Sequence, residues 1–403
     1  MITLKKFIAG LSILLIILIV YFRNINLKEN NSEPEIDEKE SWIEEKMKSM
    51  SLEEKIGQML IVYDYSQEVD DELLNKLNEI KPGGFILFRK NFANYEQTQK
   101  LISDINSTSE IPMFISIDQE GGRVQRLKEL DDQTITLFPS MYELGNTNDE
   151  NLADEVGKVM GEELRVFNIN MNFAPVLDIY SNPSNTVIGD RSFGRTAETV
   201  SKMALSFSEG LKSTGIIPVY KHFPGHGNTF EDSHDTLPII NKTKEELMEL
   251  ELKPFIDAID NGAEVIMVGH LAVPKITGDT TPASLSRKIV TDLLKKELGF
   301  EGIVITDALN MGALTSKYSE EEIYINAINA GVDLLLMPNF NKETINMLIN
   351  AINNGTIKKE EIDDSVTKIL SLKYDYLLKE NTYTREYLNS LEHQEILSKI
   401  KEY

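Results

Sequence analysis

"GIVITD", residues 302–307, is an apolar run that ends in a carboxylate, and it is one of eight short apolar runs along the chain. The others, in order, are "GQMLIVY" 57–63, "GGFILF" 83–88, "PMFISID" 112–118, "MNFAPVLDI" 171–179, "IIPVYKH" 216–222, "EVIMVGH" 264–270 and "VDLLLMP" 332–338. Segments with helical periodicity, such as 200–211 and 247–259, separate these runs. Eight strands alternating with helices predict an α/β fold, a (β/α)8 TIM-type barrel.

Polar residues stand at the ends of five of these predicted strands: Asp118, Asp178, Lys221 with His222, His270 and Asp307. The carboxyl ends of barrel strands meet at one face, where the active sites of this fold lie. Any one of these residues alone is equally well explained as a group that braces a loop. Their convergence on one face favours a functional site.

Composition excludes several classes of function. The 403-residue chain has no Cys, which excludes disulfides, thiolate zinc sites and Cys nucleophiles. Its formal net charge of −24 and pI near 4.7 argue against nucleic acid as a partner, because the phosphate backbone would be repelled. Hydrophobic residues make up 41% of the chain, enough for a large core.

The N-terminus predicts attachment to a membrane. Residues 7–22, "FIAGLSILLIILIVYF", follow two lysines and carry no charge. No small-residue cleavage site follows, so an uncleaved anchor in residues 1–22 is favoured over a signal sequence, with the rest of the chain outside the cell. The expected organisation continues with a flexible polar linker at 23–41, the barrel domain at 42–380 and a helical, polar tail at 381–403. The membrane is contacted only through the anchor.

The loop "KHFPGHGNTFEDSHDTLP", residues 221–238, holds three of the five histidines. Its prolines and glycines exclude a helix through the first half, and with it the helical His pair of many metal sites. Ligands gathered from separate strands keep a metal site open, and His226 alone suits a hydrogen-bonded turn. Asp232 and His234 favour a third chemistry, proton transfer. They are two residues apart and share one side of an extended segment, and a carboxylate that orients an imidazole makes it a usable acid near neutral pH.

Four motifs resemble those of family 3 glycoside hydrolases, in the β-N-acetylglucosaminidase branch. They are "IDQEGGRVQR" 117–126, "GDRSFG" 189–194, the loop 221–238 and "ITDALNMGAL" 305–314. The resemblance covers nearly all of residues 45–375. It implies a (β/α)8 barrel that removes N-acetylglucosamine from the non-reducing end of peptidoglycan fragments, with retention of configuration and without a metal or other cofactor.

The resemblance also assigns roles. It implies that Asp307 is the nucleophile, that His234 is the acid/base and that Asp232 orients it. It further implies that the sugar hydroxyls are held by Asp118, Arg126, Arg191, Lys221 and His222. Asp178 is expected to brace an arginine or the loop. The loop departs from the family in having Asn228 where Asp is usual, which puts the rigidity of the loop in question.

The sequence thus predicts an exo-acting, retaining β-N-acetylglucosaminidase that is a monomer and takes an amino-sugar glycan or muropeptide as its substrate. Within the family, a β-glucosidase or a glycoside phosphorylase is the alternative. Outside it, the alternatives are a metal-dependent barrel hydrolase and a glycan-binding module without turnover.

Overall fold

The computed structural model describes residues 38–130, 135–229 and 237–402. The chain divides into two compact units, residues 1–46 and 47–403. Helix α2 (Glu38–Ser49) begins within the predicted linker 23–41, with acidic residues in its first turn, where the helix dipole favours them. The predicted anchor or signal, residues 1–22, lies outside the described residues. Among the helices that the structure describes, none is long and apolar enough to cross a membrane.

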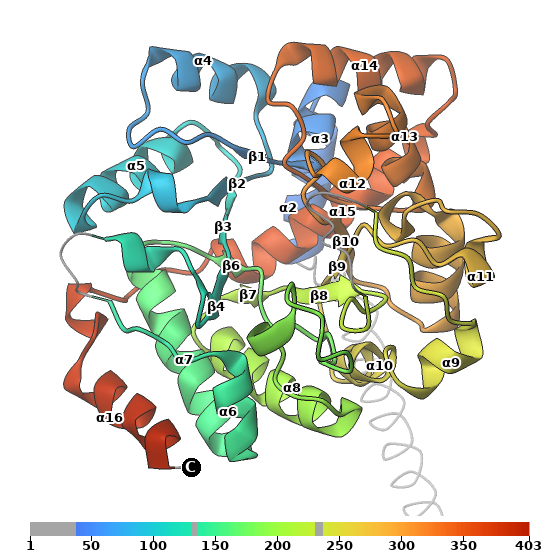
Figure 1. Ribbon diagram of the computed structural model, residues 1–403. Coiled ribbons are helices and arrows are strands. Elements are labelled where there is room, and N and C mark those ends of the chain that lie inside the picture. The colour runs from blue at the N-terminus through green and yellow to red at the C-terminus, as the bar shows by residue number, and fades with distance from the viewer. Residues whose placement is uncertain (1–37, 131–134, 230–236, 403) are drawn as a thin grey trace, which may run out of the picture. The chain divides into compact units, whose positions relative to one another are not determined.

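All eight predicted runs contribute strands to the second unit. The strands are β1 (Leu60–Tyr63), β2 (Gly84–Leu87), β3 (Phe114–Ile117), β6 (Met171–Asn172), β7 (Ile217–Pro218) with β8 (Tyr220–Phe223), β9 (Val265–Val268), β10 (Ile303–Thr306) and β11 (Leu335–Leu336). They pair in parallel in two ladders, β11-β1-β2-β3-β6-β7 and β8-β9-β10. The predicted α/β class is confirmed, and in place of one closed eight-stranded barrel the strands form a curled parallel sheet in two ladders (Figure 1).

Two seams interrupt the regular pairing that an ideal barrel would have. The first splits the fifth predicted run at Val219. An isolated bridge, Val176 to Lys221, crosses it, and the N–H of Val219 donates to the carbonyls of Asn172 and Ala174 at 3.0 Å each. Pro175 and Pro218 flank this seam, and proline has no N–H to give to a ladder. The second seam lies between β10 and β11, where one bridge joins Ile305 and Leu334.

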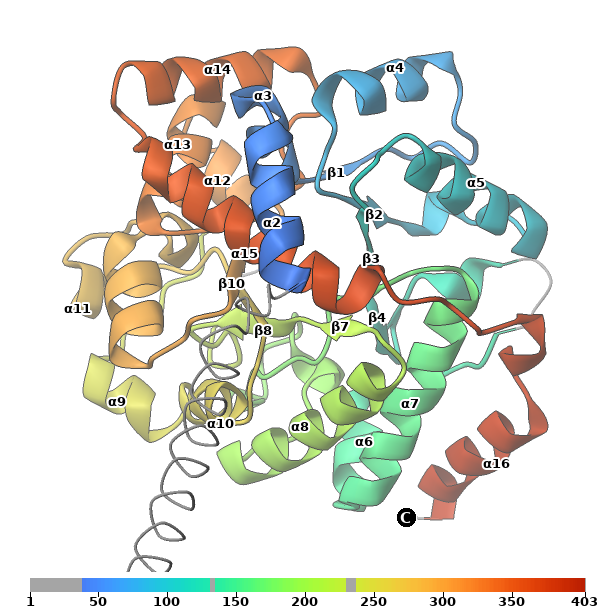
Figure 2. The same cartoon turned by 180° about the vertical axis from the view of Figure 1, so that it is seen from behind.

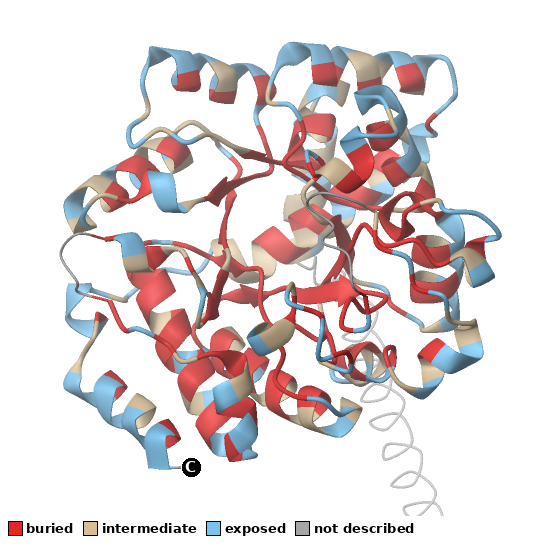
Figure 3. Ribbon diagram, viewed as in Figure 1, coloured by how far each residue is buried: buried red, intermediate tan, exposed pale blue. Residues whose placement is uncertain are grey.

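Helices surround the sheet (Figures 1 and 2). The helices that alternate with the strands are α3 (Leu52–Gln58), α4 (Asp71–Ile80), α5 (Tyr95–Ser107), α7 (Glu150–Val166), α8 (Ala197–Ser213), α10 (Lys253–Asp260), the π-helical η5 (Lys288–Glu297), α13 (Glu320–Ala330), α14 (Lys342–Asn353) and α15 (Lys359–Leu377). Strand residues are buried almost throughout (Figure 3), which explains why the strands read as unbroken apolar runs.

Further elements lie in the connections and in the C-terminal segment. They are the hairpin β4 (Gln119–Gly121) and β5 (Val124–Gln125), the helices α6 (Met141–Thr147), α9 (Lys244–Glu249), α11 (Pro274–Thr277), α12 (Gly312–Thr315) and α16 (Leu391–Lys399), and the 3-10 turns η1 (Arg89–Asn91), η2 (Leu127–Glu129), η3 (Gly189–Arg191), η4 (Ala283–Leu285), η6 (Arg385–Tyr387) and η7 (Ile400–Glu402).

A buried lysine lies near the amino ends of the strands. The ammonium of Lys373, on α15, donates to Gln58 Oε1 at 2.7 Å and lies 5.0 Å from the centre of the Phe114 ring. Burial lowers the pKa of Lys373 to about 7. The core beside the strands therefore contains the buried amine of Lys373, which the apolar pattern of the sequence does not predict.

Helix α16 is attached to α7 through a buried histidine. His393 Nε2 lies 2.9 Å from Glu162 Oε2, and its Nδ1 lies 3.3 Å from Glu163 Oε1. Glu163 also accepts the backbone N–H of Asn389 at 2.7 Å. Burial by itself would lower the pKa of His393, but the two carboxylates raise it to about 9. The imidazolium is therefore the form that holds α16.

We expect this attachment to weaken in alkali. A histidine whose pKa is raised on folding stabilises fully below its ordinary pKa of 6.5, and the effect is lost as the pH rises through about 9. Amide hydrogen exchange of residues 389–402, corrected for intrinsic rates, should show lower protection at pH 10 than at pH 7. His393→Gln should lower protection at pH 7 and remove most of the pH dependence. Equal protection of the unmodified chain at both pH values would contradict this account.

Candidate active site

A cavity of about 710 Å³ opens at the carboxyl ends of the strands. Six of the eight residues that the sequence analysis selected line it: Asp118, Arg126, Arg191, Lys221, His222 and Asp307. The other two, Asp232 and His234, lie outside the described residues. The predicted convergence of strand ends thus places side chains from β3, β8 and β10 around one space.

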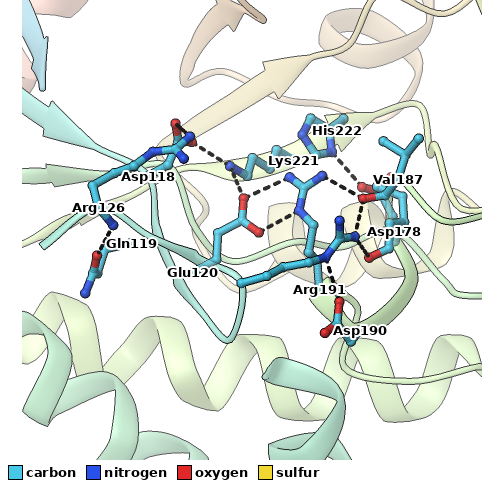
Figure 4. A network of polar contacts seen from close by, with 12 residues as sticks. Asp118, Gln119, Glu120, Arg126, Asp178, Val187, Asp190, Arg191, Lys221 and His222 are labelled. Atoms are coloured by element: carbon cyan, nitrogen blue, oxygen red, sulfur yellow. Dashed lines mark hydrogen bonds and ion pairs between the residues drawn. The ribbon is translucent and has the colours of Figure 1, made fainter. Parts of the chain in front are cut away.

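The ammonium of Lys221 joins two carboxylates across the cavity wall (Figure 4). It lies 3.0 Å from Asp118 Oδ1 and 2.6 Å from Glu120 Oε1. Lys221 belongs to β8, Asp118 follows β3, and Glu120 is in the hairpin after it. The side chain of Lys221 is only 3% exposed, so the ammonium is held almost entirely by these carboxylates.

Two arginines complete the network. Arg191 holds Glu120 in a bidentate pair at 2.7 and 2.8 Å, and Arg126 Nη2 lies 2.9 Å from Asp118 Oδ2. Burial alone would raise the pKa of both carboxyls. Lys221 and Arg126 nevertheless hold the pKa of Asp118 well below its usual range, and Arg191 with Lys221 lowers the pKa of Glu120 to about 2. Both acids are ionised at neutral pH, as a set of charged hydrogen-bonding groups.

Asp178 does not form the predicted brace to an arginine. Its Oδ2 lies 2.6 Å from His222 Nδ1, and its Oδ1 accepts the backbone N–H of His226 at 2.5 Å. Burial would raise the pKa of Asp178, but His222 and then His226 lower it. The carboxylate orients the imidazole of His222 and fixes the start of the loop, which is the second role that the sequence analysis allowed.

Asp307 stands at the end of β10, on the cavity side. The backbone N–H of Ala308 donates to its Oδ1 at 2.8 Å. Burial would raise the pKa of Asp307, but His222, His270 and this N–H lower it. His270 does not line the cavity: its Nδ1 lies 2.8 Å from Ser284 Oγ and its Nε2 donates to the carbonyl of Ala308 at 2.9 Å. His270 therefore holds the backbone next to an ionised Asp307.

The described part of the loop, up to Thr229, is fixed through its backbone. A Cβ at Gly227 would lie 1.8 Å from the carbonyl oxygen of Ile179, so only glycine fits there. Asn185 Nδ2 donates to the carbonyl of His226 at 2.8 Å. The side chain of Asn228 is exposed and contributes none of these contacts, so the departure from Asp leaves the base of the loop intact.

The sequence analysis missed two parts of the cavity. Glu120 lies inside a motif that was recognised, yet no role was assigned to it because its partners come from distant segments. An apolar wall of the cavity was also missed, and its residues are Ile86, Met267, Met311, Leu336 and Met337. All but Met311 belong to strand ends that the pattern identified only as core, and Met311 follows β10.

Metal ligands were a further possibility at this face. Within the ranges that the structure describes, no group of three or more histidines and carboxylates is arranged to hold a metal ion. The fold and the cavity define an α/β enzyme whose site, at the carboxyl ends of parallel strands, presents an ionised carboxylate and a charged, hydrogen-bonding wall.

Comparison with known proteins gives the family. The model described as Glycosyl hydrolase family 3 N terminal domain matches residues 51–372. The chain belongs to family 3 of the glycoside hydrolases, and it is a glycoside hydrolase.

Named relatives agree with this. Beta-hexosaminidase A of Pseudoalteromonas piscicida is 32% identical over 330 residues, which cover 75% of this chain and 55% of that protein. A Beta-hexosaminidase of Methylobacillus flagellatus is 34% identical over 289 residues, covering 70% of this chain and 81% of that one. The structure of a family 3 beta-N-acetylglucosaminidase from Paenibacillus sp. matches with a TM-score of 0.82 and 37% identity, covering 88% of this chain and 69% of that one.

The charged network yields a stability prediction. Lys221→Met would remove the cation that Asp118 and Glu120 share and leave each carboxylate with one arginine, so we expect a loss of about 3 kcal/mol, the lower end for breaking a buried pair. Denaturant unfolding at pH 7 should show a loss of this size. The double variant Lys221→Met with Glu120→Gln removes one of the two carboxylates that lost the lysine and should regain part of the stability without regaining activity. An equally unstable double variant would show that repulsion between the carboxylates is not the cause.

Proposed function

We propose that the protein is an exo-acting, retaining β-N-acetylglucosaminidase that hydrolyses terminal N-acetylglucosamine from peptidoglycan-derived fragments. The observation that carries the proposal is the position of Asp307. Its ionised carboxylate faces a cavity whose other wall presents charged groups suited to sugar hydroxyls. The names of the relatives support the choice of an amino sugar.

The cavity suits one terminal sugar residue. Its volume of about 710 Å³ lies within the range of small-ligand sites, roughly 300–1,000 Å³. Asp118, Glu120, Lys221 and the arginines are held by one another before any substrate arrives, so hydroxyls meet donors and acceptors that need little reorganisation. The apolar wall is matched to the C–H groups of the ring and to the methyl of an acetamido group.

The proposed reaction has two steps. In the first, the Asp307 carboxylate attacks the anomeric carbon, the bond to the leaving oxygen breaks and His234 gives that oxygen its proton. In the second, His234 takes a proton from water, the water oxygen attacks the anomeric carbon and Asp307 leaves as a carboxylate. Two inversions retain the configuration. Asp232 and His234 enter as a prediction from the sequence, since both lie outside the described residues.

Hydrolysis is proposed in preference to phosphorolysis and to metal-dependent chemistry. A nitrophenyl N-acetyl-β-glucosaminide should be cleaved at the same rate in phosphate and in a non-phosphate buffer, and a chelator should not slow it. The matching β-glucoside should be a poorer substrate.

We also propose that residues 7–22 anchor the enzyme outside the cell. Full-length protein should then stay in the membrane fraction after alkaline carbonate extraction, whereas a form beginning at residue 42 should not.

Replacing the nucleophile gives the sharpest test. Asp307→Asn keeps the shape of the side chain and removes its charge, so turnover should fall by about four orders of magnitude or more, as for other single nucleophile losses. Binding of N-acetylglucosamine, measured by calorimetry, should persist. Asp260→Asn makes the same change on an exposed carboxylate at the end of α10 and serves as the control. An Asp307→Asn enzyme with a tenth of the normal activity would exclude Asp307 as the nucleophile.

The proton donor can be tested separately. In His234→Gly, a nitrophenolate still leaves without protonation, but the attacking water lacks its base, so the glycosyl-enzyme should accumulate. We expect a burst of about one nitrophenolate per enzyme, slow turnover afterwards, and rescue by azide with a β-glycosyl azide as product. Loss of nitrophenyl and natural substrates alike, without burst or azide rescue, would assign His234 a structural role.

A further inference from the structure

The rim of the cavity carries an exposed aromatic residue and a lysine that the proposed reaction does not use. Tyr65 lines the cavity and is 46% exposed. The ammonium of Lys90, also exposed, lies 4.9 Å from the centre of the Tyr65 ring. Both members of this pair are exposed, whereas the groups that would hold the terminal sugar are buried or half-buried.

The rim is built from two connected loops. Buried Asn91 donates through Nδ2 to the carbonyls of Asp64 and Ser66, at 2.8 Å each. Gln67 Nε2 donates to the carbonyl of Lys90 at 3.2 Å. Phe88 and Tyr63 meet the Tyr65 ring edge to face, with ring centres 5.6 and 5.5 Å away. The loops after β1 and β2 therefore fix Tyr65, and the ring in turn restricts Lys90.

Lys90 differs from the other cations near the mouth. Arg89 pairs with Glu129, Arg123 with Asp190 and Arg126 with Asp118. In the part of the chain that the structure describes, Lys90 has the Tyr65 ring and no carboxylate within ion-pair distance. On a chain with a net charge of −24, a cation without an acidic partner at the mouth of the active site is available to an anion.

We infer that Lys90, held by Tyr65, binds a carboxylate carried by the leaving group of the substrate. The inference rests on the proposed function, because an enzyme that releases the terminal sugar in the buried cavity must place the leaving group at the open rim. The ligand class is a glycan whose leaving sugar bears a carboxylate, either on the sugar as an acidic ether or on an attached peptide. Lys90 and Tyr65 then determine which glycans are cleaved, and they take no part in the bond exchange.

The test compares leaving groups that differ in charge. The substrates are N-acetylglucosaminyl-β-1,4-N-acetylmuramic acid, its neutral methylamide, the same disaccharide extended by L-Ala-D-isoGlu, and N-acetylglucosaminyl-β-1,4-N-acetylglucosamine. For each enzyme, kcat/KM on the charged substrates is divided by kcat/KM on the neutral disaccharide. Lys90→Met should lower this ratio by about three- to fivefold, the size of one partly exposed ion pair, and Lys90→Glu should lower it further. The control is Lys359→Met, an exposed lysine outside the cavity lining, which should leave the ratio unchanged.

The four substrates also distinguish the two possible positions of the carboxylate that Lys90 binds. If the acidic ether is the ligand, the methylamide should behave like the neutral disaccharide; if the peptide is the ligand, only the extended substrate should respond to Lys90. Tyr65→Leu should lower the ratio while Tyr65→Phe keeps it, because a phenyl ring still holds the ammonium. An unchanged ratio in Lys90→Met, with good turnover of the neutral substrates, would overturn the inference and leave the proposed function standing. Failure to cleave any of the four would instead refute the proposed function.

Discussion

The contact of one ammonium with two carboxylates determines much of this site. Asp118 and Glu120 lie two residues apart and face the same space, so neither would stay ionised there without a cation. Lys221, on β8 beside the seam where the ladder breaks, supplies a cation to both, and Arg126 and Arg191 add one to each. The same contact connects the hairpin after β3 to β8, which lies beyond β6 in the curled sheet. The contact of Lys221 with the two carboxylates therefore stabilises the fold and also keeps charged groups in the cavity wall.

Around this contact the cavity has two kinds of wall. The charged wall comes from β3, β8 and the segment that holds Arg191, and each member is already paired with another. The apolar wall comes from the ends of β2, β9 and β11 and the segment after β10, and Asp307 lines the same cavity. A ligand with hydroxyls on one side and C–H groups on the other matches this division. The arrangement is largely preorganised, which limits the reorganisation that the reaction must drive.

The sequence predicted the fold well because parallel strands covered on both faces must be apolar along their whole length. It also predicted which strand ends meet, since that follows from the direction of the strands. It did not predict pairings that depend on distance in space. Asp178 contacts His222, whereas an arginine was one of its two expected partners. No role was predicted for Glu120, which pairs with Arg191. Lys373 was hidden for a similar reason, because its partners Gln58 and Phe114 lie far away in the chain.

The contact of Gly227 with the carbonyl of Ile179 has a consequence for how such an enzyme diversifies. It is a contact of backbone with backbone, and the neighbouring bonds from Asn185 and Asp178 also end on main-chain atoms of His226. The foundation of the loop is therefore set by main-chain geometry, which tolerates change in an exposed side chain such as that of Asn228. Exposed side chains around such a site can therefore vary while the glycine is retained, so new specificities can arise without rebuilding the parallel sheet beneath them.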